Sequence, residues 1–303
     1  MKFQKITALF VIIIILNACA TYKPQYKSQN VNNDFPNKEI THSFYLIGDG
    51  GNSPIGSTSK GKYSGNILLD VLFEASIYPE QIETPITTKW IETEGETFVT
   101  VPSIDSITGD KLTAFAPNTI GIPYFKRTVP FTMEICKQLF DISKLFERIE
   151  NIEMVAASFL AFANQEIIYR KNENTDLELT PEGVLQDTID TCLIIAKRGS
   201  GSSDEKQKFA ELQKGIRAFG TGFLMNGNFR IDDAVPAAAR IAYLSVKILH
   251  NELSPIEYYE GQDIKEWNIE NQEWSFLNRL KKQPDKSGFY YWYKALEVIN
   301  LIN

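Results

Sequence analysis

Hydrophobic residues are spaced like β-strands in the first third of the chain and like α-helices in most of the remainder. Short apolar or alternating runs at 66–73, 85–91 and 97–102 predict strands, and Glu94-Gly95-Glu96 predicts the turn between the last two. A further apolar run at 42–52 also has the character of a strand. The pattern therefore begins with strands that are separated by polar and glycine-rich joints.

Helical spacing follows. It predicts a short helix around 109–112, a second helix around 137–141, and a series of helices from 150 to the end. In the helix after 150, one apolar face is predicted to contain Val155, Phe159, Phe162, Ile167 and Ile168. We predict an α+β fold, with a β-containing region at 66–125 and a mainly α-helical domain at 126–303.

Capping residues predict where the later helices begin. Thr180 with Pro181 is typical of a helix start. Asp232 or Asp233 is predicted to cap a later helix, and the segment from Ser254 to Glu257 has the form of a capping box.

Composition narrows the classes of function. The 303-residue chain has a formal net charge of −7, so no overall positive field would attract nucleic acid. Three cysteines and two histidines are too few for a disulfide framework, a histidine-rich metal site or a histidine-dependent triad. Cys136 and Cys192 lie in apolar helical patterns and are predicted to be small core residues.

The first 19 residues resemble a bacterial lipoprotein signal peptide. Two lysines precede an apolar run at 6–16, and Asn17-Ala18-Cys19 follows it. The resemblance implies lipidation of Cys19, a polar tether in the residues that follow, and membrane contact only through the lipidated N-terminus. The alternative is an uncleaved anchor helix.

The run at 42–52 ends in Gly-Asp-Gly-Gly and resembles the opening strand of a calcineurin-like metallophosphoesterase. Asp49 would match the first metal-binding aspartate of that family. The sequence contains none of the family's later GDxxY, GNHE or GHxH stretches. A metallophosphoesterase is therefore the third functional hypothesis, and a strand and turn without a metal role is the alternative.

Three segments further along resemble the AbiEii/AbiGii abortive-infection toxin family of nucleotidyltransferases. They read LLDVLF, VTVPSIDSITGDKLTAFAPNTIGIPYFK and EICKQLFDISKLF, and the resemblance extends over residues 66 to 303. It implies a partial nucleotidyltransferase-like β-sheet at 66–125, a cognate antitoxin as partner, RNA as a possible acceptor, and cytoplasmic action.

The same resemblance implies roles for four residues. Asp70 matches a carboxylate that is catalytic and binds metal, and Lys111 matches a lysine that is catalytic and binds nucleotide. Lys137 matches a nucleotide-binding residue, and Asp141 a catalytic one. The implied cofactor is Mg²⁺ and the substrate a nucleoside triphosphate, since carboxylate-held Mg²⁺ neutralises the charge that develops during nucleotidyl transfer.

The sequence departs from this family upstream of Asp70. No Gly-Ser followed by Asp-x-Asp precedes it, so Asp70 would lack the partners that hold two metals. This predicts a truncated, inactive nucleotidyltransferase-like toxin that follows a tether and a grafted strand at 20–65. The two parts would be joined near residues 53–65, by a genomic fusion or by an assembly error. The alternative function is a non-enzymatic helical interaction module displayed as a lipoprotein.

Each of the four residues also has an ordinary structural interpretation. Asp70 could be a strand acid with a neighbouring donor, Lys111 a surface lysine, and Lys137 with Asp141 an i, i+4 helix pair.

Overall fold

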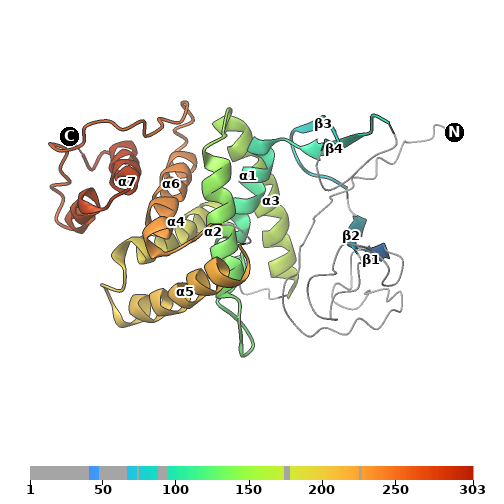
Figure 1. Cartoon of the computed structure of the whole chain (residues 1–303), viewed down its shortest axis with the longest axis horizontal. Helices are drawn as coiled ribbons and strands as arrows, with labels where there is room; N and C mark the ends of the chain where they lie inside the picture. The colour runs from blue at the N-terminus through green and yellow to red at the C-terminus, as the bar shows by residue number, and fades with distance from the viewer. Residues whose placement is uncertain are drawn as a thin grey trace. The chain divides into compact units, whose positions relative to one another are not determined.

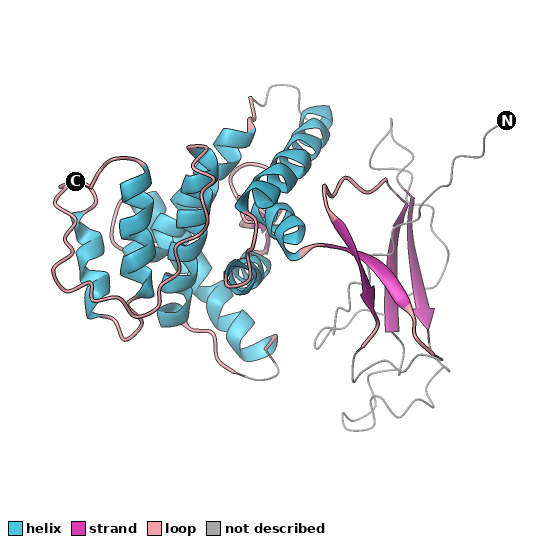
Figure 2. Ribbon diagram, turned by 90° about the horizontal axis from the view of Figure 1, so that it is seen from above, coloured by secondary structure: helices cyan, strands magenta, loops and turns pink. Residues whose placement is uncertain are grey.

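The computed structural model describes residues 41–47, 67–73, 75–87, 95–173, 178–224 and 227–302. The chain divides into two units. Residues 1–76 and 81–102 form the strand-bearing unit, and residues 77–80 and 103–303 form the helical unit. Figure 1 shows the order of the elements, and Figure 2 separates helices from strands by colour. The predicted α+β class is confirmed.

The strand-bearing unit contains two antiparallel pairs of strands. β1 (Thr41–Ile47) pairs with β2 (Ile67–Phe73), and β3 (Gln81–Pro85) pairs with β4 (Phe98–Pro102). The strands predicted at 66–73 and 97–102 are confirmed. Residues 42–47 of the first run and 67–73 of the later run, which the sequence assigned to opposite sides of a join, lie in the two strands of one pair.

The strand predicted at 85–91 is wrong at its start. The ladder begins at Gln81, and Pro85 at its end lies opposite Phe98, the first residue of β4. Ile86 donates one further backbone hydrogen bond, to the carbonyl of Thr97. The sequence pattern did not predict β3 because most of its residues are polar and show no alternation of apolar positions. Residues 88–94, the rest of the predicted strand, lie outside the described residues.

The helical unit contains seven α-helices, one 3₁₀ helix and a short β-hairpin in the part of the chain that is described. In chain order they are α1 (Ile104–Ala114), β5 (Phe125–Lys126), β6 (Val129–Pro130), α2 (Thr132–Phe146), α3 (Ile152–Glu173), α4 (Pro181–Lys197), α5 (Ser203–Gly222), α6 (Ile231–Leu249), η1 (Ser275–Lys282) and α7 (Ser287–Val298).

The longer segment of this unit begins at Ser103, so the unit includes α1, which lies in the region 66–125 that the sequence assigned to the β-containing part. The reason is that α1 packs extensively on α3 and also contacts α2. Ser103 caps α1 by accepting a hydrogen bond from the backbone N–H of Ser106 at 3.2 Å. A glycine brings α1 and α3 together, because a Cβ at Gly109 would lie 2.4 Å from the carbonyl oxygen of Val155.

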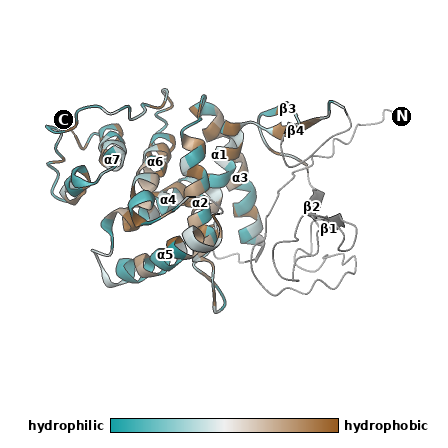
Figure 3. Cartoon of the chain, viewed as in Figure 1, coloured by the Kyte–Doolittle hydropathy of each residue, from teal (hydrophilic) through white to brown (hydrophobic). Residues whose placement is uncertain are grey.

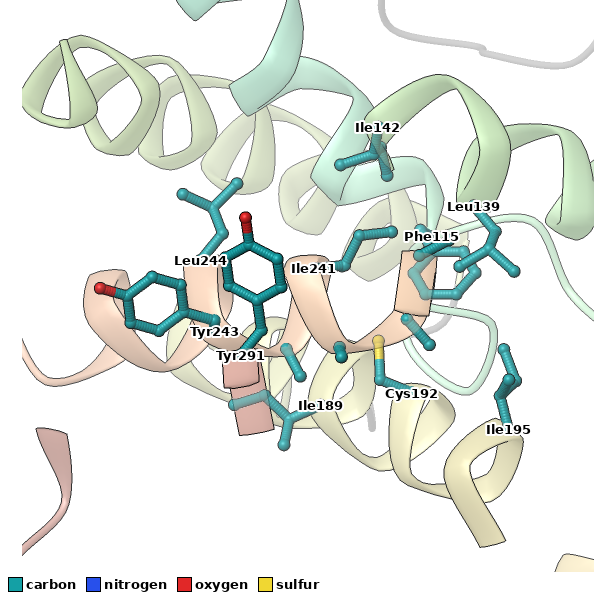
Figure 4. Packing of buried hydrophobic residues seen from close by; sticks show 14 of the residues in the cluster. Phe115, Leu139, Ile142, Ile189, Cys192, Ile195, Ile241, Tyr243, Leu244 and Tyr291 are labelled. Atoms are coloured by element: carbon teal, nitrogen blue, oxygen red, sulfur yellow. The ribbon is translucent and has the colours of Figure 1, made fainter. Parts of the chain in front are cut away.

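The core of the unit is built around α6, which contacts α2, α4 and α7. Figure 4 shows Phe115, Leu139, Cys192 and Ile241 gathered between these elements. The prediction that Cys136 and Cys192 are core residues is confirmed, since both are fully buried, and burial raises the pKa of both thiols. Outer helices such as α5 alternate between polar and apolar residues (Figure 3).

Three local predictions on the helices need correction. Ile168 lies on the outer face of α3, while its neighbour Ile167 is buried. The N-cap of α6 is Arg230, whose N–H donates to the carboxylate of Asp233 at 2.8 Å. Ser254 starts no helix, because its hydroxyl is held by Lys247 and Glu252 at the end of α6.

Candidate functional site

The stretch from α1 to α2 contains three of the four residues that the nucleotidyltransferase resemblance singled out. Lys111 lies in the last turn of α1, and its ammonium is 3.0 Å from the carboxylate of Asp141 on α2. The same ammonium donates to the side-chain oxygen of Gln138 at 3.2 Å. Both members of the ion pair are half-buried, with side chains 29% and 28% exposed. The structure thus brings Lys111 and Asp141 together, and each neutralises the other.

Lys137 does not join this cluster. Although it is four residues before Asp141 on the same helix, the Asp141 carboxylate turns to α1. The Lys137 ammonium instead lies 5.1 Å from the centre of the Phe223 ring, at the end of α5. The predicted Lys137–Asp141 pair is therefore wrong, because a lysine from a neighbouring helix competes for the carboxylate.

Asp110, the residue before Lys111, has a partner that the sequence did not indicate. Its carboxylate accepts a hydrogen bond of 2.6 Å from the hydroxyl of Tyr78, 32 positions earlier. Burial raises the pKa of Asp110, although the bond from Tyr78 and the charge of Lys111 act in the opposite direction. The Tyr78 ring packs against Phe162 with 4.6 Å between centroids, which anchors residues 77–80 to the helical unit.

Two further buried carboxylates hold loops in place. Asp105 accepts from the backbone N–H groups of Glu150 and Asn151, just before α3. Asp187 on α4 accepts from the backbone and side chain of Asn118 and from the hydroxyl of Thr119. Burial raises the pKa of both acids. The two carboxylates therefore hold in place the turn before α3 and the loop that follows α1.

Asp70 belongs to the other unit. It lies in the middle of β2, opposite Phe44 of β1, whereas Lys111, Lys137 and Asp141 belong to the helical unit. Its role as a catalytic and metal-binding residue stays a prediction. Cys19 and Asp49 lie outside the described residues.

The hairpin between α1 and α2 is the most exposed apolar feature of this stretch. Its two strands are joined by Arg127 and Thr128, and Phe131 donates to the carbonyl of Tyr124 at its base. Phe125 is 44% exposed and Val129 is 56% exposed. Figure 1 shows the hairpin, in green between α1 and α2, extending beyond the ends of the helices.

Register places these two apolar side chains on opposite faces of the hairpin. Phe125 pairs with Pro130, and Lys126 pairs with Val129, so Phe125 lies on one face and Val129 on the other. The Lys126 ammonium lies 4.8 Å from the ring centre of Phe131. Arg127 adopts φ of 56°, in the left-handed region that glycine and asparagine occupy more easily.

An open cavity of about 340 Å³ lies between the second half of α5 and the start of α6. Two guanidinium groups, Arg217 and Arg230, line it beside the apolar Ile216 and Phe229. Asp232 and Asp233 follow in the first turn of α6, where Asp232 pairs with Arg198 and Asp233 accepts from the backbone N–H of Arg230.

Within the described ranges, no three His, Cys, Asp or Glu side chains are grouped so that they could hold a metal ion. None of the helices in these ranges combines the length and the apolar character needed to cross a membrane. Comparison of the chain with protein-family models, with curated proteins and with solved structures finds no match.

Proposed function

We propose that the helical unit is a non-enzymatic binding module that engages a partner protein through the β5–β6 hairpin. The observation that supports this most directly is the exposure of Phe125 and Val129 on a projecting hairpin. Burying such side chains contributes roughly 25 cal/mol per Å² of apolar surface, so a partner that covers them gains binding energy.

The geometry of the hairpin indicates how a partner binds. Because apolar side chains lie on both faces, the hairpin suits a groove that encloses it better than a flat surface that covers one face. Arg127 presents its guanidinium at the turn although its backbone conformation costs about 1 kcal/mol or more. A contact between the Arg127 guanidinium and an acidic group of the partner would offset this cost.

Charge identifies the class of partner. No Asp or Glu occurs between Asp110 and Glu134, and Lys126 and Arg127 lie at the tip, on a chain whose net charge is −7. A groove with acidic side chains at its rim complements this tip and disfavours partners of the wrong charge. A cognate antitoxin, which the toxin-family resemblance implies, is the partner we propose.

Affinity capture from the source cells tests the proposal, with the full chain as bait and quantitative mass spectrometry as readout. We expect one dominant acidic protein, and about tenfold or greater loss of it with the Phe125→Ala/Val129→Ala double variant, the change typical of central interface residues. Leu301→Ala is the matched control, because Leu301 is an exposed apolar residue elsewhere. Capture of the same protein at wild-type level by the double variant would refute the proposal.

Nucleotide binding is the second candidate, and one observation favours it. Lys111 and Asp141, to which the nucleotidyltransferase resemblance gives roles in one site, come from different helices and form an ion pair of 3.0 Å. Binding of a triphosphate would require the Lys111 ammonium to exchange the Asp141 carboxylate for a phosphate oxygen. The test is a rise in Tm with Mg²⁺ and nucleoside triphosphates, together with labelling of RNA from a labelled triphosphate, both lost in Lys111→Ala and Asp70→Ala.

The location of the module is a separate proposal. Lipidation at Cys19 would display it at a membrane, whereas the nucleotide-binding candidate requires the cytoplasm, where nucleoside triphosphates are found. Metabolic labelling with a radioactive fatty acid distinguishes the two, since label that disappears in Cys19→Ala places the chain at the membrane.

A further inference from the structure

Helix α3 presents a regular outward stripe of exposed residues. From residue 153 to residue 171 its exposed positions follow one another at intervals of four, three, four, four and three residues, which matches the α-helical repeat of 3.6. This outer stripe consists of Glu153, Ala157, Leu160, Asn164, Ile168 and Lys171. The opposite side of α3 is buried in the core through residues such as Val155 and Phe159.

The middle of the outer stripe is more apolar than a solvent-facing helix surface requires. Leu160 is 44% exposed and Ile168 is 58% exposed, and Ala157 lies between Leu160 and the N-terminal end. A helix that is apolar on its outer face as well as its inner face is usually covered on both sides. The outer stripe is therefore a candidate contact surface.

Its charges lie at its two ends and have opposite signs. Glu153 is the first residue of the outer stripe and Lys171 the last. Neither makes an ion pair within the described residues. An antiparallel copy of the same stripe would bring Glu153 of each chain to Lys171 of the other.

We infer that α3 pairs with α3 of a second copy of this chain, antiparallel and about a two-fold axis near residue 162. That position is midway between Glu153 and Lys171, and it is also midway between Leu160 and Asn164. With this centre, the small Ala157 lies one residue step from the position opposite the large, exposed Ile168 of the other copy. Charge is then complementary at both ends of the outer stripe, and a small side chain lies near a large one at Ala157 and Ile168, as a self-complementary two-fold interface requires.

The expected dimer is weak. Eighteen residue steps at 1.5 Å extend over about 27 Å, and one helix seam of that length buries less than the roughly 800 Å² per partner of a standard interface. Monomer and dimer should therefore exchange, and the proportion of dimer should rise with protein concentration.

Sedimentation of the full chain over about a hundredfold range of concentration tests the inference. Glu153→Lys and Lys171→Glu should each weaken the dimer about tenfold, because each turns two attractive contacts per dimer into repulsive ones. The Glu153→Lys/Lys171→Glu double variant restores opposite charges and should return the Kd to within about threefold of wild type. This recovery separates pairing from effects on folding, since both substitutions oppose the helix dipole and neither would be rescued by the other within one chain.

Glu182→Lys on α4 is the control, because it makes the same charge change at an exposed residue of another helix. It should leave sedimentation unchanged. A chain that stays monomeric at every concentration would overturn the inference and indicate that something other than a second copy covers the outer stripe. A dimer that is insensitive to both single charge reversals would also overturn it, because its interface would lie elsewhere.

Discussion

At the scale of single residues, the Lys111–Asp141 ion pair has a structural role that can be measured apart from any role in binding nucleotide. Lys111→Met or Asp141→Asn should each lower the free energy of unfolding by about 1 kcal/mol, since each leaves a half-buried partner without its charge. The double variant should cost less than the sum of the two. Urea denaturation of the four proteins gives the coupling energy.

Salt provides the check on this interpretation. The coupling energy should decrease as ionic strength rises, because the pair is only partly shielded from solvent. Additive effects of the two substitutions, with no coupling at low salt, would show that the contact contributes nothing to stability.

Asp110 predicts a dependence of stability on pH. Because burial raises its pKa above that of the unfolded chain, its contribution to stability is fully present below the unfolded value of about 4 and is lost as pH rises through the folded value. Asp110→Asn keeps an acceptor for the Tyr78 hydroxyl and removes the charge. As pH rises from 4 to 7, wild type should lose stability relative to the variant, so the free energy of unfolding of the variant minus that of wild type should increase.

Urea denaturation of both proteins across that pH range measures the difference. A variant that becomes relatively less stable towards pH 7 would show that the Asp110 carboxylate is stabilised as an anion, by Tyr78 and Lys111, more strongly than burial penalises it.

At the scale of elements, the close approach of α1 to α3 depends on a single glycine. A Cβ at Gly109 would lie 2.4 Å from the Val155 carbonyl oxygen and 2.6 Å from the Phe159 nitrogen, both backbone atoms that cannot move alone. Gly109→Ala should therefore force the helices apart and lower the free energy of unfolding by about 2 kcal/mol or more.

Gly183→Ala is the matched control for this substitution. Gly183 is also helical, but a Cβ there would meet only the Thr180 hydroxyl, at 3.5 Å. Alanine is the better helix former, so this variant should be as stable as wild type or up to about 1 kcal/mol more stable. Thermal unfolding of both variants shows whether the Gly109→Ala variant is destabilised by the close approach of α1 and α3. Equal changes in stability for the two variants would exclude this explanation.

Sequence periodicity located most of these elements because most of the helices have one continuous apolar face. It did not distinguish Ile167 from Ile168, since neighbouring residues lie about 100° apart and the pattern does not state where the buried face ends. The family resemblance singled out Lys111 and Asp141, whereas helical spacing paired Asp141 with Lys137, because spacing reveals only partners on the same helix. Helical spacing could not predict the Tyr78–Asp110 contact either, because the two residues are 32 positions apart.

At the scale of the whole molecule, the helical unit should fold without the residues before Ile77. Its core is formed by α1 to α7, and residues 77–80 belong to it although 81–102 do not. Tyr78 anchors that short segment through the Phe162 ring and the Asp110 carboxylate. The boundary of a stable fragment should therefore be Ile77 and not Ser103, where α1 is capped.

Two fragments test this boundary. The fragment that begins at Ile77 should unfold cooperatively, whereas the fragment that begins at Ser103 should be less stable by about 2 kcal/mol, since it uncovers Phe162 and leaves Asp110 without its donor. Tyr78→Phe in the longer fragment removes the hydroxyl and keeps the ring, so it should lose only part of that difference. Equal free energies of unfolding for the two fragments would show that residues 77–80 contribute nothing to the fold, and the helical unit would then begin at α1.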